Sequence, residues 1–95
     1  MKKTFSLKAA GKDDARVRDQ IRHEVNKYVR RERQKEVPEG FDLWAFNCKV
    51  GASQAGAETK PLKEIGGAID NLAQAGAIEV YLEVLAAPGL RKFPA

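Results

Sequence analysis

The residue types best suited to chemistry are scarce in this chain of 95 residues, which has one histidine, His23, and one cysteine, Cys48. A zinc site needs several histidine or cysteine ligands, and a histidine base needs a positioned partner in a cleft. His23 lies on the polar face of a predicted helix. Cys48 lies at an apolar position of a predicted strand, where cysteine packs as a small hydrophobe. We therefore expect no catalytic residue, no metal and no cofactor, and predict that the chain is not an enzyme.

The cations of the chain are concentrated near its N-terminus. Residues 1–36 hold 12 Lys or Arg against 6 Asp or Glu, whereas residues 37–95 hold 5 against 7. The formal net charge of +4 therefore originates in the first segment. Such asymmetry is typical of chains that associate with an anionic partner, here nucleic acid or another polyanion. The competing interpretation is a solvated helix face, on which long cationic side chains cover apolar flanks.

Residues 14–36 are predicted to form the long amphipathic helix that carries these charges. At about 100° per residue its apolar side chains cluster on one face, and they are Val17, Ile21, Val25, Tyr28 and Val29. Asp13 or Asp14 is the expected N-cap, and Pro38 stops the helix because it has no N–H to donate. The candidate phosphate contacts are Lys12, Arg16, Lys27, Arg30, Arg31 and Arg33.

The remainder of the chain shows strand and helix patterns in turn. Strands are expected at residues 2–8, 41–50 and 78–85, and a second helix at residues 62–75. Residues 55–61 are a weak strand candidate because they contain few β-branched residues. The side chains expected to face the helices are Trp44, Phe46, Cys48 and Val50 in one strand, and Ile78, Val80, Leu82 and Val84 in the last. Pro88 is expected to end that last strand.

This order of elements predicts an α+β fold of the ferredoxin-like βαββαβ type. In this two-layer sandwich both helices cover one face of a four-stranded antiparallel sheet. If residues 55–61 are only a loop, the alternative is a three-stranded βαβαβ layer. The length suits one small core, so residues 1–95 are expected to form a single α+β domain, with residues 90–95 as a frayed tail.

The sheet face turned away from the helices is a second candidate surface. Leu43, Ala45 and Tyr81 are expected there, where they offer a site for a protein partner or for a second copy of the chain. An RNA recognition motif stacks bases on aromatic residues of such a face. Glu79 and Glu83 flank Tyr81 and would repel phosphate, so any nucleic acid is expected to contact the first helix instead.

No segment of the sequence indicates a membrane span or a secretory signal. The two lysines after Met1 are not followed by an apolar stretch of about 7–15 residues, and the longest apolar run is far below the roughly 20 residues of a membrane helix. A single cysteine cannot form an internal disulfide. The simplest expectation is a cytoplasmic protein that binds no membrane.

Several motifs together carry a resemblance to a known family. They are the run from His23 to Lys35, the continuation through Pro38-Glu39-Gly40 to Trp44, Cys48, Lys49 and Gly51, the opening Met1–Leu7, and Pro88-Gly89. These motifs resemble a family of short, uncharacterised bacterial proteins, a domain of unknown function, over nearly the whole chain. The resemblance implies no activity and no functional residue. The residues themselves favour a non-enzymatic accessory protein that binds nucleic acid or another polyanion, and the alternative is a protein-interaction or homodimerisation module.

Overall fold

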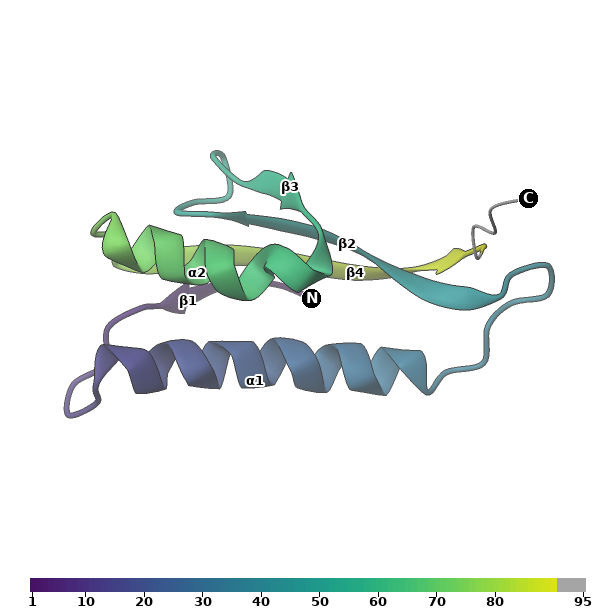
Figure 1. The fold of residues 1–95 in the computed structure, drawn as a ribbon, viewed down its shortest axis with the longest axis horizontal. Coiled ribbons are helices and arrows are strands. Elements are labelled where there is room, and N and C mark those ends of the chain that lie inside the picture. Colours follow the sequence, from purple (N-terminus) through teal and green to yellow (C-terminus); the bar gives the residue numbers. More distant parts are fainter. Residues whose placement is uncertain (91–95) are drawn as a thin grey trace.

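The computed structural model describes residues 1–90, which form one sheet and two α-helices (Figure 1). In chain order the elements are β1 (Lys2–Ser6), α1 (Asp14–Arg33), β2 (Leu43–Gly51), β3 (Glu58–Lys60), the 3-10 helix η1 (Leu62–Glu64), α2 (Ile65–Gln74) and β4 (Glu79–Gly89). The α+β class is confirmed, and so is the third strand, although it is only three residues long. The three-stranded alternative is therefore wrong. Apart from Leu90, the expected tail at 90–95 lies outside the described residues.

The strands follow the order β1-β4-β2-β3, and every neighbouring pair is antiparallel. This order does not confirm the ferredoxin-like arrangement, because β4 lies between β1 and β2 and β3 lies at the edge, whereas a ferredoxin-like sheet has β3 between β1 and β2. The backbone of the N-terminus explains the position of β1. Met1 and Val84 exchange two hydrogen bonds of 2.8 Å, so the first residues pair with the N-terminal half of the long strand β4.

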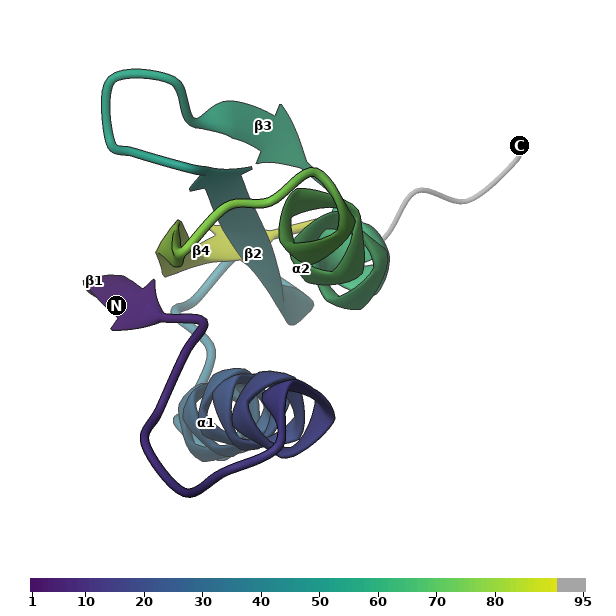
Figure 2. The same cartoon turned by 90° about the vertical axis from the view of Figure 1, so that its left-hand side faces the viewer.

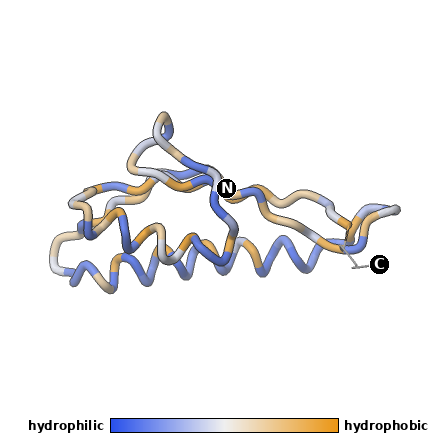
Figure 3. The backbone as a smooth tube through the Cα atoms, turned by 45° about the horizontal axis from the view of Figure 1, so that its top comes forward, coloured by the Kyte–Doolittle hydropathy of each residue, from blue (hydrophilic) through white to orange (hydrophobic). Residues whose placement is uncertain are grey.

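Both helices pack on the same face of the sheet (Figure 2). The buried residues of α1 are Val17, Ile21, Val25 and Val29, and those of α2 are Ile65 and Ile69. They meet a sheet layer made of Phe5, Cys48, Val50, Val80, Leu82 and Val84. The alternation predicted for β2 is confirmed for Phe46, Cys48 and Val50, which pack on the helix side, and the indole N–H of Trp44 donates to the carbonyl of Lys35 just past α1. Figure 3 shows the result, with hydrophilic residues dominating α1 and hydrophobic ones frequent along β2 and β4.

The distal parts of β2 and β4 continue past their outer neighbours as a two-stranded ribbon, residues 43–47 and 85–89. Pro88 lies within this ribbon, so the expectation that it ends the strand is wrong. The N–H and C=O groups of successive residues point to opposite sides of a strand, so residues 78, 84 and 88 share one direction. In this direction the C=O of Ile78 accepts from the N–H of Leu7, and Val84 bonds Met1, at the two ends of β1. The N–H that proline lacks at position 88 would point in the same direction, toward the edge of β4 beyond Met1. No strand of residues 1–90 pairs with β4 along that part of the edge. The proline therefore costs no ladder hydrogen bond.

Two further boundaries differ from the prediction. The helix expected to reach Glu36 ends at Arg33, and Gln34 caps it. Ile78, expected to face inward, is 66% exposed because the regular strand begins only at Glu79 and the chain bends at Ile78. The predicted N-cap is confirmed, since the Asp13 carboxylate accepts a hydrogen bond from the N–H of Ala15. Neither helix of the described chain combines the length and apolar character that a membrane span requires.

Candidate polyanion-binding face

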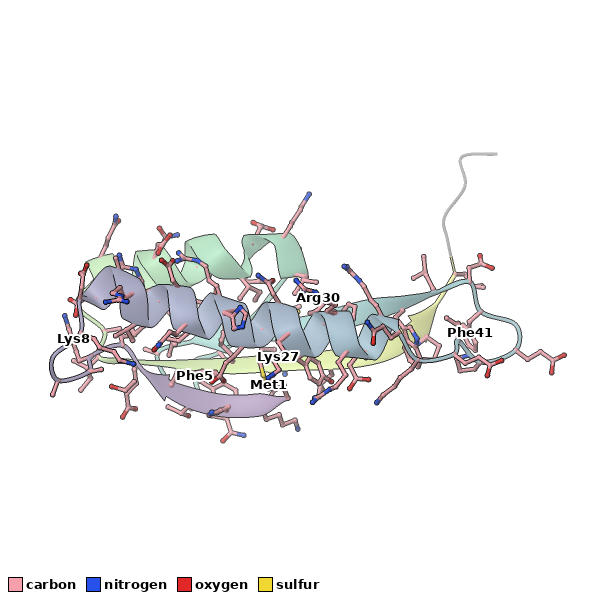
Figure 4. All side chains as sticks on the ribbon, turned by 90° about the horizontal axis from the view of Figure 1, so that it is seen from below. Met1, Phe5, Lys8, Lys27, Arg30 and Phe41 are labelled. Carbon is pink, nitrogen blue, oxygen red and sulfur yellow. The ribbon has the colours of Figure 1, made fainter. Side chains whose placement is uncertain are left out.

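The α-helical period of α1 distributes its exposed cations over three sides. Arg16, Lys27 and Arg30 project opposite the buried stripe, and Figure 4 views this outer side with Lys27 and Arg30 labelled. By the same period Arg31 lies near the flank that faces β1, and Arg33 lies near the flank that faces α2. All the predicted contacts are exposed, but they do not form one continuous patch.

Distance along the helix separates the predicted contacts further. Lys27, Arg30 and Arg31 fall within about one turn, where residues three and four apart are neighbours. Arg16 lies 11 residues before Lys27, roughly 16 Å away at about 1.5 Å per residue. Lys12 precedes the helix, and its ammonium donates to the side-chain oxygen of Gln20 at 3.1 Å. The structure therefore brings Lys27, Arg30 and Arg31 together in the C-terminal half of α1, and Arg33, three residues beyond Arg30, lines one cavity with it on the α2-facing flank.

Every carboxylate of α1 is paired with a cation other than these. Asp14 contacts Lys8, and Asp19 contacts Arg22 at 3.0 Å. Glu24 lies 3.5 Å from Lys3 of β1, and Glu32 lies 2.7 Å from Lys35. Within residues 1–90, no carboxylate oxygen lies within 4 Å of the side-chain nitrogens of Arg16, Lys27, Arg30, Arg31 or Arg33. The outer side of α1 thus carries uncompensated positive charge.

Aromatic rings hold two of these arginines in place. The guanidinium carbon of Arg31 lies 5.6 Å from the centre of the Tyr28 ring, and that of Arg33 lies 5.4 Å from the centre of the Phe46 ring. Stacking leaves the N–H edge of a guanidinium free to donate hydrogen bonds. Lys27 and Arg30 are also exposed, and neither contacts an aromatic ring in the described part of the chain.

The two inward cations of α1 serve a different purpose. Arg18 and Arg22 both contact the carboxylate of Asp70 on α2, and Arg22 also donates to the carbonyl of Gly66 at 3.3 Å. A Cβ at Gly66 would lie 3.3 Å from the Arg22 side chain, which explains the glycine at this helix position. These arginines join the two helices and are not available to a ligand in the way the outer ones are.

The positions of the histidine and the cysteine agree with those predicted from the sequence. His23 is exposed on the outer side of α1, and Cys48 is 1% exposed in the core, where burial raises the pKa of its thiol. A thiol held in its protonated form is a poor nucleophile. Among residues 1–90 no three His, Cys, Asp or Glu side chains are grouped so as to hold a metal ion.

The open face of the sheet differs from the prediction at Tyr81. Its hydroxyl donates to Glu83 at 2.6 Å, which holds the ring along the strand, and only 5% of the residue is exposed. This hydrogen bond, together with desolvation, raises the pKa of Tyr81, and the same bond lowers the pKa of Glu83. Leu43 is half-buried and Ala45 is exposed. The prediction of Tyr81 as an exposed contact residue is therefore wrong, whereas Leu43 and Ala45 lie on the ribbon.

A cavity of about 690 Å³ between α2 and the β2–β3 hairpin was not anticipated from the sequence. Val50, Ala68 and Leu72 contribute its apolar lining. Its charged lining consists of two lysines and two glutamates, Lys60, Lys63, Glu58 and Glu64. These charges balance, so they select no class of ligand. The one signal in the sequence is Gly67, a poor helix former that leaves open space at this wall.

Comparisons with known proteins add a family but no activity. The model of a family of unknown function (DUF6172) matches residues 1–94. No curated protein and no solved structure matches the chain. The resemblance seen in the sequence is thus confirmed as membership of a family of unknown function, and the geometry remains the only guide to activity.

Proposed function

We propose, for a chain that belongs to this family of unknown function, a non-enzymatic cytoplasmic protein that binds nucleic acid or another polyanion through the exposed cations of α1. The observation that carries the proposal is the sorting of charge on this helix. Its four carboxylates pair with Lys8, Arg22, Lys3 and Lys35, while five exposed cations have no carboxylate partner among the described residues. A helix face kept only for solubility is typically laced with pairs between residues three or four apart, and none of these five cations forms such a pair.

Glu24 illustrates the sorting best. It lies three residues before Lys27, a spacing that usually favours a pair on one helix. Here its carboxylate turns toward Lys3 of β1 and leaves Lys27 unpaired. The tertiary structure therefore increases the positive potential of the outer side beyond what the sequence of α1 implies.

The expected mode of binding is contact with phosphates and not with base edges. Unpaired lysines and arginines neutralise phosphates and release counterions, which gives an affinity that depends steeply on salt. Three to four contacts from Arg16, Lys27, Arg30 and Arg31 predict a fall of about 40- to 150-fold in affinity between about 50 and 200 mM salt. The separation of roughly 16 Å between Arg16 and Lys27 spans several phosphates of one strand.

Fluorescence anisotropy with labelled single- and double-stranded DNA and RNA tests the proposal. The variant Lys27→Gln/Arg30→Gln should lower the slope of log affinity against log salt by about 1.8, or about 0.9 for each lost contact. The matched control is Lys2→Gln/Lys49→Gln, which removes the same charge from the open face of the sheet beside Glu83. Equal losses in both variants would show a response to net charge alone. Absence of binding by the wild type at about 50 mM salt would end the proposal.

The exposed ribbon favours a second candidate, a homodimerisation module. On its open face Leu43, Ala45 and Leu85 lie beyond the reach of both helices, and Leu85 is 38% exposed. A symmetric dimer buries the same apolar patch on both subunits. Light scattering should then detect a dimer that Leu85→Glu dissociates, and a wild-type monomer at high protein concentration would exclude this candidate.

A further inference from the structure

The flank of α1 that faces the start of α2 contains two adjoining cavities. The first, of about 330 Å³, is lined by Asn26, Val29, Arg30, Arg33 and Gln34. The second, of about 270 Å³, is lined by Arg22, Val25, Asn26, Leu62, Lys63, Ile65 and Gly66. Asn26 lines both, so the two cavities adjoin at this residue, and together they are here called the flank groove. Figure 4 shows Arg30 on the α2 side of α1, where this groove lies.

The charge of the flank groove is of one sign. No carboxylate side chain lines either cavity in the described part of the chain. Three other cavities on residues 1–90 each include acidic residues: Glu58 and Glu64, Asp14 and Asp70, and Asp19 and Glu24. Arg30, Arg33 and Lys63 form no ion pair with described residues, whereas the charge of Arg22 is compensated by Asp70. The groove is therefore complementary to an anion.

The groove also has the hydrogen-bonding groups that a phosphate needs. A guanidinium offers a planar fork of N–H donors that matches two phosphate oxygens, and contact with the Phe46 ring fixes the guanidinium of Arg33. Asn26 and Gln34 add neutral amide donors on either side of Arg30 and Arg33 in sequence. The buried side chains of Val25 and Val29 form an apolar floor. The volumes of the two cavities, about 330 and 270 Å³, lie near the lower end of the roughly 300–1,000 Å³ of small-ligand sites.

We infer that the flank groove binds the phosphate of a nucleotide, with Arg30, Arg33 and Lys63 as the cations and Asn26 and Gln34 as the neutral donors. The inference rests on the proposed function and refines it, because it moves the principal contact from the outer side of α1 to its α2-facing flank. The same phosphate chemistry is available from a free mononucleotide and from a single strand of nucleic acid. Lys27 and Arg16 then contribute long-range electrostatic attraction, and the phosphate binds in the flank groove.

NMR spectroscopy of the ¹⁵N-labelled protein distinguishes these sources. The side-chain amide signals of Asn26 and Gln34 should shift on titration with AMP or with a short oligothymidylate. The variant Asn26→Asp places a carboxylate in the groove and should weaken binding at least about fivefold, the effect of one like charge at about 4 Å in water. Its matched control is Gln54→Glu, which adds the same charge in the exposed 52–57 loop. Arg33→Lys should also weaken binding, since it keeps the charge and removes the fork.

The outcomes of these titrations distinguish a mononucleotide site, a nucleic-acid site and the absence of a site in the flank groove. Selective weakening of AMP binding by Asn26→Asp assigns the groove to mononucleotides, and selective weakening of oligothymidylate binding alone assigns it to a nucleic-acid strand. The inference that the flank groove binds phosphate would be refuted if Asn26→Asp and Gln54→Glu weakened binding equally. It would also be refuted if the side-chain amide signals of Asn26 and Gln34 did not shift. If oligothymidylate then still shifts the backbone signals around Arg16 and Lys27, the proposed function survives without it. A spectrum that no ligand changes refutes both.

Discussion

Removing the carboxylate of Asp70 should loosen the packing of α1 against α2. Asp70 is approached by Arg22, which donates to it, and by Arg18, whose buried Nε lies 3.0 Å from Oδ1 outside hydrogen-bond geometry. The side chain of Asp70 is 44% exposed, and those of Arg18 and Arg22 are 25% and 31% exposed. The contact is therefore intermediate between a solvated surface pair and a buried one.

The magnitude follows from that intermediate burial. Exposed ion pairs contribute about 0–1 kcal/mol and hydrogen bonds to charged groups about 1.5–3 kcal/mol. The variant Asp70→Asn keeps the shape but removes the carboxylate partner of Arg18 and leaves Arg22 with Asp19 alone. We expect a loss of about 1–2 kcal/mol in the free energy of unfolding, which corresponds to roughly 4–16 °C in Tm for a domain of this size.

Urea denaturation followed by circular dichroism measures this loss. The control is Asp19→Asn, which removes the same charge from a carboxylate that also contacts Arg22 but is 75% exposed. A pair three residues apart on a helix contributes about 0.2–0.5 kcal/mol, so the control should shift the midpoint only slightly. If both variants lose the same free energy, the junction between the helices is no stronger than a surface contact, and the reasoning fails.

Two further predictions concern single positions. Gly67→Ala should raise the free energy of unfolding by about 0.5–1 kcal/mol, because its Cβ would enter open space in a helix. Gly66→Ala should raise it less, because its Cβ would crowd the side chain of Arg22. Equal gains of the two variants in thermal melts would contradict the contact between Gly66 and Arg22. The bond between Tyr81 and Glu83 should contribute a pH-dependent part of stability. Its Glu83 part is present above the unfolded pKa of a glutamate and is lost as pH falls through the lowered pKa of Glu83; its Tyr81 part is present below the unfolded pKa of a tyrosine and is lost as pH rises through the raised pKa of Tyr81. Tyr81→Phe should flatten both limbs of a stability–pH curve, and an unchanged curve would count against the bond.

The sequence by itself determined the elements and their buried sides. Val17, Ile21, Val25 and Val29 recur at the helical period, and Cys48 and Val50 at the strand period, so the faces of α1 and β2 follow from local geometry. The exposed cations of α1 follow in the same way, because they lie opposite a stripe that must be buried. These features depend on residues a few positions apart and need no knowledge of the rest of the chain.

Only the tertiary structure decided which elements meet. The pairing of Met1 with Val84 places β1 beside β4. Beyond Met1 this edge of β4 has no neighbouring strand within residues 1–90, so Pro88 can lie within the strand without loss of a ladder hydrogen bond. The pairing of Glu24 with Lys3 leaves Lys27 without a partner, and the approach of Lys63 beside Asn26 creates the flank groove. These contacts join residues far apart in sequence, and their partners are fixed by the packing of whole elements. Periodicity states which side of an element is buried, but the neighbour that covers it is chosen by the free energy of the complete fold.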